Sequence, residues 1–331
     1  MIHHFGALPD GTAVSLYTIS DGELTAKVTD LGATLVSLLV PDKHGNTDDV
    51  VLGFDDCTEY YKSFGFFGAV IGRNANRIRG GKFTLNGENV QLKPFAWGHN
   101  LHSGLDFFHR RMWQVSHHSE NTITFLLDSP YGDQGFPGNA RIGVTYSVSD
   151  HALSIQYRMV SDRDTVCNMT NHSYFNLAGH HRPELAMKQI LQMDAQRYTP
   201  ADRHMIPFGE LVSVEGTALD FRKPKALDTN LSLFFKGYDH NYEVKGDPCA
   251  VLYDPHSGRR MEVSTDCPGL QLYTANGTKA LGKGGIHYGN HCGVCLETQF
   301  YPDSVNHPEW KQPFIKAGTP YKSETVYQFS W

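Results

Sequence analysis

The chain has 331 residues, of which 40% are hydrophobic and 19% are charged, and its formal net charge at pH 7 is −6. Because this balance leaves no basic surplus for a phosphate backbone, we expect no nucleic-acid partner. Residues 1–17 lack the basic and apolar regions of a signal peptide, and no apolar run reaches the roughly 18 residues of a membrane-spanning helix. We therefore expect a cytoplasmic protein with no membrane partner.

Strand patterns dominate the chain, beginning with alternating segments at residues 24–28 and 33–40. In residues 82–92, the Asn86-Gly87 dipeptide separates two short β-like runs, which is the strongest local hairpin signal. Two further hairpins are predicted from the paired runs at residues 141–148 with 153–160 and at residues 250–253 with 259–263.

Helical patterns are few and short, and we predict helices only over residues 58–62 and 308–311. No strand-helix-strand rhythm of the kind that builds parallel sheets is present. Internal repeats and low-complexity linkers are also missing from the sequence, and the motif residues are spread from about position 76 to 297. The sequence therefore predicts a mainly antiparallel, all-β protein with one domain over residues 1–331.

Six cysteines are dispersed through a chain that is long enough to fold without disulfides, so we expect reduced thiols. Cys292 and Cys295 form one Cys-x-x-Cys pair, but no second pair completes a zinc site. In a strand, these two side chains would also point to opposite faces. We therefore expect no metal at this pair.

Two largely apolar, strand-like segments each carry a candidate proton-transfer side chain: His172 in residues 171–177 (NHSYFNL) and Glu297 in residues 296–303 (LETQFYPD). The period-two pattern places Glu297 on a polar strand face whose reverse side is apolar. An imidazole with a pKa near ~6.5 and a carboxylate with a pKa near ~4.3 can serve as general acid and general base at neutral pH. A core histidine with a backbone partner and a solvated glutamate on an exposed face are the structural alternatives.

Four more polar residues have contexts that suit a sugar-binding site. Asp239 lies in residues 237–242 (GYDHNY), where aromatic rings alternate with hydrogen-bonding groups, and Gln271 lies between two leucines. His102 lies in a glycine-bounded segment, where a structural role in a turn is the alternative. Arg77 lies in a run of glycines and arginines with neither P-loop nor dinucleotide spacing, so a hydroxyl-binding or hairpin-covering arginine is favoured over a phosphate site.

These segments together resemble the aldose 1-epimerase (galactose mutarotase) family. The motifs occur in the family's order and span most of the chain: ANRI at 75–78, NLH at 100–102, TNHSYFNL at 170–177, YTPAD at 198–202, GYDHNY at 237–242, PGLQLYTAN at 268–276 and CLETQFYPD at 295–303. The resemblance implies a large antiparallel β-sandwich of the galactose mutarotase type, with the site in a groove across one sheet.

The same resemblance implies an isomerase that interconverts the α and β anomers of galactose- or glucose-type aldoses. His172 would be the general acid that protonates the ring oxygen, and Glu297 the general base that removes the proton of the C1 hydroxyl. The implied substrate-binding residues are Asn76, Arg77, His102, Asp239 and Gln271. The reaction needs no cofactor, and the partner is a monosaccharide bound by a monomer or homodimer.

Three other functions fit parts of the pattern. A hexose 6-phosphate 1-epimerase on the same fold should need a basic cluster at the rim of the groove. A noncatalytic sugar-binding module should have lost one proton-transfer residue, whereas both are present. A glycosidase would use paired carboxylates, whereas the motifs place a histidine opposite the glutamate.

Overall fold

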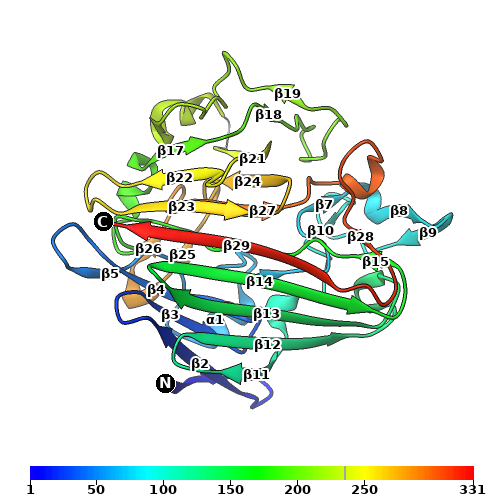
Figure 1. The fold of residues 1–331 in the computed structure, drawn as a ribbon, viewed down its shortest axis with the longest axis horizontal. Coiled ribbons are helices and arrows are strands. Elements are labelled where there is room, and N and C mark those ends of the chain that lie inside the picture. The colour runs from blue at the N-terminus through cyan, green and yellow to red at the C-terminus, as the bar shows by residue number, and fades with distance from the viewer. Residues whose placement is uncertain (235) are drawn as a thin grey trace.

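The computed structural model describes residues 1–234 and 236–331. Antiparallel strands make up most of it, as the sequence predicts (Figure 1). The α-helix among these residues, α1 (Cys57–Lys62), begins where Asp56 accepts a hydrogen bond from the Thr58 backbone N–H at 2.7 Å. The helix predicted over residues 58–62 is therefore confirmed. Short 3₁₀-helices connect the strands: η1 (Arg79–Gly81), η2 (Phe108–Arg110), η3 (Asp133–Gly135), η4 (Pro183–Lys188), η5 (Leu227–Thr229), η6 (Leu231–Leu233), η7 (Lys283–Gly285) and η8 (Ser304–Asn306).

The helix predicted over residues 308–311 is wrong, because the chain forms a turn there. The side-chain amide of Gln312 donates hydrogen bonds to the carbonyl groups of Ser304, His307 and Trp310 at 2.7–3.0 Å. The Gln312 side chain thus supplements the backbone turn bonds from His307 N–H to Ser304 and from Trp310 N–H to His307.

The largest sheet has nine strands in the order β11-β12-β13-β14-β29-β23-β22-β17-β20. The C-terminal strand lies between β14 and β23, near the middle of this sheet (Figure 1). Two of the predicted hairpins, β13-β14 and β22-β23, are confirmed as neighbours in it. The bounds are β11 (Gln114–His118), β12 (Thr122–Ser129), β13 (Ala140–Ser149), β14 (Ala152–Ser161), β29 (Tyr321–Ser330), β23 (Arg260–Thr265), β22 (Ala250–Tyr253), β17 (Ile190–Met193) and β20 (Lys225–Ala226).

Two five-stranded sheets accompany the large one. The first pairs consecutive strands of the N-terminal part: β1 (Ile2–Ala7), β2 (Ala13–Ser20), β3 (Thr25–Thr29), β4 (Thr34–Pro41) and β5 (Thr47–Asp49). The second has the order β19-β18-β21-β24-β27, with β19 (Val212–Ser213), β18 (Arg197–Tyr198), β21 (Asp239–Glu243), β24 (Gly269–Tyr273) and β27 (Cys295–Gln299). This second sheet carries three of the predicted site residues.

Five two-stranded pairs complete the strand inventory of the described residues. The predicted hairpin at Asn86-Gly87 is one of them, and both turn residues have positive φ angles, 53° and 83°, as its two-residue turn requires. The pairs are β6 (Val70–Ile71) with β16 (Thr170–Asn171), β7 (Arg77–Ile78) with β10 (Asn100–Leu101), β8 (Lys82–Leu85) with β9 (Glu88–Gln91), β15 (Thr165–Val166) with β28 (Phe314–Ile315), and β25 (Ala280–Leu281) with β26 (His287–Tyr288).

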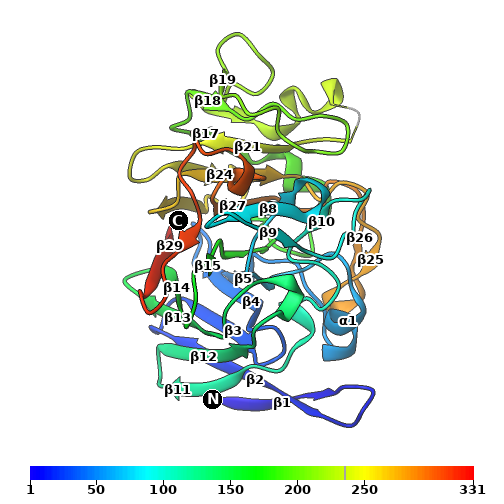
Figure 2. The same ribbon diagram turned by 90° about the vertical axis from the view of Figure 1, so that its right-hand side faces the viewer.

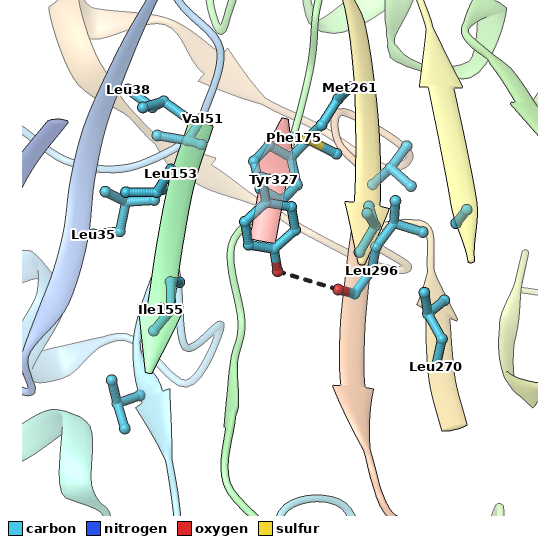
Figure 3. Close-up of a cluster of buried hydrophobic side chains, with 14 of the residues drawn as sticks. Leu35, Leu38, Val51, Leu153, Ile155, Phe175, Met261, Leu270, Leu296 and Tyr327 are labelled. Atoms are coloured by element: carbon cyan, nitrogen blue, oxygen red, sulfur yellow. Dashed lines mark hydrogen bonds between the residues drawn. The ribbon is translucent and has the colours of Figure 1, made fainter. Parts of the chain in front are cut away.

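The main core lies between the sheets. In the side view, β14 and β29 run along one flank, while β25 and β26 lie on the other (Figure 2). Figure 3 shows Leu153 of β14 beside Leu35 and Val51, and Tyr327 of β29 beside Phe175 and Leu296 of β27. The Tyr327 hydroxyl donates a hydrogen bond to the Leu296 carbonyl group at 3.4 Å. Because Leu296 points into this core, its neighbour Glu297 points to the opposite face of the sheet.

Within residues 1–234 and 236–331, no helix has the length and apolar character that crossing a membrane requires.

Candidate active site

A cavity of ≈ 680 Å³ lies over the face of the sheet that carries Glu297. Its walls come from the α1 region, from β7 and β10, from the segment after β16, and from strands β21, β24 and β27. All the residues predicted from the sequence to act in catalysis or binding line this one cavity: Asn76, Arg77, His102, His172, Asp239, Gln271 and Glu297. Residues far apart in the chain therefore meet at one site.

Three neighbouring strands supply the floor of the cavity. Gln271 of β24 lies directly opposite Glu297 of β27, and Asp239 is contributed by β21 on the other side of β24. The Gln271 amide donates a hydrogen bond to the Asp239 carboxylate at 2.6 Å. Because alternate side chains of paired strands share a face, the register alone gathers these groups. Asp239, Gln271 and Glu297 therefore lie on one face of three neighbouring strands.

Two features of Glu297 disfavour its charged form. Its side chain is almost fully covered, and Oε2 accepts no hydrogen bond from the described residues. The solvated-face alternative is therefore wrong. Burial raises the pKa of Glu297 well above its ordinary 4.5, nearby Asp239 raises this pKa further, and Arg77 opposes both effects.

His172 lies just past β16, in a segment that is irregular rather than strand-like as predicted. Its backbone N–H donates to the Ala69 carbonyl group at 2.9 Å, and its own carbonyl group accepts from the Gly68 N–H at 3.0 Å. These two bonds fix the backbone of His172 without a regular ladder. The imidazole is buried, and burial lowers its pKa to about 4.

The imidazole and the carboxylate face each other across the cavity floor. The distance from Nε2 of His172 to Oε1 of Glu297 is 3.7 Å. Burial favours the uncharged form of each group, because it raises the pKa of Glu297 and lowers that of His172. The neutral pair and the ion pair differ only by the position of one proton, and a substrate hydroxyl that donates to Glu297 favours its carboxylate form.

His102 and Asn76 form a paired turn beside this floor. Both have positive φ angles, 52° and 61°, and the Asn76 backbone N–H donates to Nδ1 of His102 at 3.2 Å. With Nδ1 as acceptor, the proton of the neutral His102 ring is on Nε2. His102 therefore has a structural role in the turn, and its Nε2–H can still donate to a ligand.

Arg77 follows Asn76 and extends one of its guanidinium nitrogens toward the Asn76 side-chain oxygen, at 3.5 Å. The Nε group of Arg77 is buried and has no acceptor among the described residues. The Trp97 ring lies against the Arg77 guanidinium, with its centroid 5.8 Å from Cζ. Arg77 can therefore donate to ligand oxygens inside the cavity.

Aromatic walls surround the imidazole, and sequence reasoning missed them. The rings of Tyr174 and Phe66 stack on His172 at centroid distances of 5.0 and 5.9 Å, and Tyr273 meets it edge-on at 6.0 Å. All three rings line the cavity. Tyr273 lies two residues from Gln271 on β24, a period-two signal that could have identified it, whereas Tyr174 follows His172 in an irregular segment. Phe66 has a positive φ of 54°, which no local pattern indicates.

One sulfur also lies at the site. His172, Cys295 and Glu297 each place a potential ligand atom within 4.8 Å of the others. However, Cys295 contacts Nδ1 of the imidazole at 3.5 Å, whereas Glu297 faces Nε2. Because the two contacts use opposite ring nitrogens, they orient the imidazole and do not converge on one point. All six cysteines are buried free thiols, as expected from the sequence.

An antiparallel β-sandwich whose polar, aromatic-lined cavity holds a buried imidazole–carboxylate pair is the architecture of an acid–base enzyme that accommodates a small polar ligand. The comparisons agree. Residues 15–328 match the aldose 1-epimerase family, and the chain belongs to this family.

Relatives match over nearly the whole chain. The galactose mutarotase of Bos taurus is 39% identical over 98% of this chain and 97% of its own length. The aldose 1-epimerase of Escherichia coli is 38% identical over 97% of this chain and 96% of its own length. A crystal structure of a GalM/aldose epimerase homologue from C. elegans superposes with a TM-score of 0.91 at 31% identity, over 96% of this chain and 99% of that chain. The β-sandwich predicted from the sequence is thus confirmed.

Proposed function

We propose that this protein is an aldose 1-epimerase that interconverts the α and β anomers of galactose- or glucose-type aldoses. The observation that carries the proposal is the His172–Glu297 pair, 3.7 Å apart, on the floor of a cavity with planar donors and acceptors around it. Membership of the aldose 1-epimerase family supports the same activity.

In the proposed mechanism, Glu297 accepts the proton of the C1 hydroxyl while His172 donates its Nε2 proton to the ring oxygen. The C1–O5 bond breaks, and its electron pair stays on O5 as the C1 carbonyl group forms. The acyclic aldehyde rotates about C1–C2, and reclosure on its other face, with the two residues in exchanged roles, gives the opposite anomer. Positioned acid and base groups typically contribute ~10²–10⁴-fold to a rate.

The remaining groups hold the ring in reach of both proton transfers. Gln271 offers an amide group on β24, next to the strand of Glu297, and Asp239 offers a carboxylate on β21, one strand further. Arg77 and His102 offer donors from the opposite wall, with Asn76 fixing the turn between them. The stacked rings around His172 suit the C–H faces of a sugar.

Polarimetry with α-galactose and α-glucose tests the proposal. Glu297→Gln and His172→Asn should each abolish the catalysed approach to anomeric equilibrium, while circular dichroism shows a folded protein. Glu324→Gln and His118→Asn are matched controls outside the cavity and should leave the rate unchanged. Near-wild-type rates in either cavity variant would remove that residue from the mechanism.

A hexose 6-phosphate 1-epimerase is the second candidate, because Lys62 and Lys279 line the cavity. Lys62 is paired with Glu59 at 3.5 Å, whereas Lys279 has no ion-pair partner among the described residues. Comparing rates with glucose and glucose 6-phosphate separates the two candidates. A higher kcat/KM with the phosphorylated sugar would establish the second.

We also propose that residues 1–331 form one catalytic domain, because the site draws on residues from 76 to 297. Six buried free thiols support a reducing, cytoplasmic compartment. Limited proteolysis and cell fractionation test these two proposals. A stable fragment that lacks one wall of the cavity, or recovery outside the cytoplasm, would contradict them.

A further inference from the structure

Cys295 occupies a position that the proposed mechanism does not use. It precedes Glu297 by two residues on β27, so both side chains are on the same face of the strand. Its side chain is completely buried, and Sγ lies 3.5 Å from Nδ1 of His172. Among the described residues, this sulfur is the side-chain hydrogen-bond partner of Nδ1.

Burial lowers the pKa of His172, and a hydrogen bond to the residue's own backbone opposes this effect, whereas the other side chains around the ring offer Nδ1 no hydrogen bond among the described residues. Phe66 and Tyr174 stack on the faces of the ring, and Tyr273 and His102 meet it edge-on at centroid distances of 6.0 and 5.7 Å. The Tyr174 hydroxyl donates away from the ring to the Gly65 carbonyl group, and the Tyr273 hydroxyl donates to the Asn276 carbonyl group. The charged neighbour, Glu297, is on the Nε2 side.

We propose that Cys295 is a positioning residue that keeps a proton on Nδ1 of His172 and thereby reserves Nε2 for exchange with the sugar. This inference rests on the proposed mutarotase function. In the acid form of His172, both nitrogens carry protons, with Nδ1–H donating to Sγ and Nε2–H directed at the ring oxygen. After Nε2 donates its proton, Nδ1–H still donates to Sγ, and the free Nε2 can take a proton back.

A thiol suits this role because it stays uncharged. Burial raises the pKa of Cys295 well above its ordinary 9.0, and Glu297 raises it further, so the group remains a thiol at neutral pH. A carboxylate in the same place would add a second negative charge beside Glu297. The sulfur is instead a neutral, weak acceptor, which orients the ring without competing for its proton.

The test uses the full-length protein and variants at position 295. Cys295→Ala removes the acceptor, and we expect kcat for galactose to fall by about 10- to 100-fold with little change in KM, as is typical when a partner that orients a histidine is lost. Because the imidazolium loses a hydrogen bond, the acid limb of the pH–rate profile should also move to lower pH. Cys295→Ser keeps an acceptor. It should restore much of kcat and return the acid limb to its wild-type pH.

Cys292→Ala is the matched control, because Cys292 is also a buried free thiol but has no contact with His172. It should leave kcat and the pH profile unchanged. If Cys295→Ala does not fold, Cys295→Val fills the space without an acceptor and should show the same loss. Wild-type kcat and an unmoved acid limb in the Ala or Val variant would overturn this inference, whereas an inactive wild-type protein would overturn the proposed function itself.

Discussion

Replacing Glu297 by glutamine should destroy activity and stabilise the protein at the same time. The two effects have one cause, which is a carboxyl group that is placed for chemistry in surroundings that disfavour its charge. Its side chain is buried, Oε2 has no donor among the described residues, and Asp239 adds a negative charge nearby. Glutamine keeps the shape, and its amide can donate to Oε1 of Gln271 on the next strand, an oxygen that also has no partner in the described part of the chain.

The raised pKa of Glu297 determines how the free energy of unfolding changes with pH. Below the ordinary value of 4.5, Glu297 is protonated in both the folded and the unfolded chain, so it makes no difference to stability. As the pH rises, the unfolded chain releases the proton while the folded chain keeps it, and the free energy of unfolding falls until the pH passes the folded-state pKa. Glutamine does not titrate, so its advantage should be absent near pH 4 and present at pH 8.

The size of the shift can be set from typical values. Single stabilising substitutions contribute about 0.5–2 kcal/mol. An unfolding entropy of about 2.1 cal/mol/K per residue amounts to roughly 0.7 kcal/mol/K for this chain, so Tm at pH 8 should rise by about 1–3 °C. Differential scanning calorimetry at pH 4 and pH 8, paired with polarimetry, measures both effects. A lower Tm at pH 8 together with lost activity would show a structural role for Glu297 and would refute this reasoning.

Two further predictions follow from buried charges. The pH dependence of kcat/KM should be bell-shaped, with an acid limb near pH 4, because below the lowered pKa of His172 the pair binds a second proton and no base remains; a rate that keeps rising below pH 4 would contradict it. Lys283 donates to the Asp49 carboxylate and to the carbonyl groups of Val36 and Val51 at 2.6–2.9 Å. Lys283→Met should therefore cost about 3–5 kcal/mol and lower Tm by several degrees, whereas the exposed Lys316→Met should change Tm by less than about 1 °C.

Much of the fold could be predicted because its signals are local. The Asn86-Gly87 turn and the alternation along β13 and β14 depend on backbone preference and on which face meets the core. The turn at residues 308–311 could not be predicted in this way. It depends on Gln312 reaching back to carbonyl groups up to eight residues earlier, which no periodic pattern reports.

The site residues also differ in whether a local sequence pattern could place them. Asp239, Gln271 and Glu297 could be placed together because strand alternation puts each on one face, although their strand order came only from the structure. The surroundings of His172 could not be predicted, since it lies in an irregular segment where the period-two rule does not hold. Its stacking partner Phe66 depends on a positive φ angle that is set by tertiary contacts.

The spacing of the proposed acid and base is set by the core beneath them. Phe175, three residues after His172, exchanges two backbone hydrogen bonds with Val294, three residues before Glu297, at 2.8 and 2.9 Å. The Phe175 ring also packs on Tyr327 at a centroid distance of 5.0 Å, within the cluster of Figure 3. Because this bridge joins the two segments directly, a core change at Phe175 alters the distance between the proton donor and the acceptor. We therefore expect the proposed catalysis to depend on Phe175, a hydrophobic residue that lies outside the cavity.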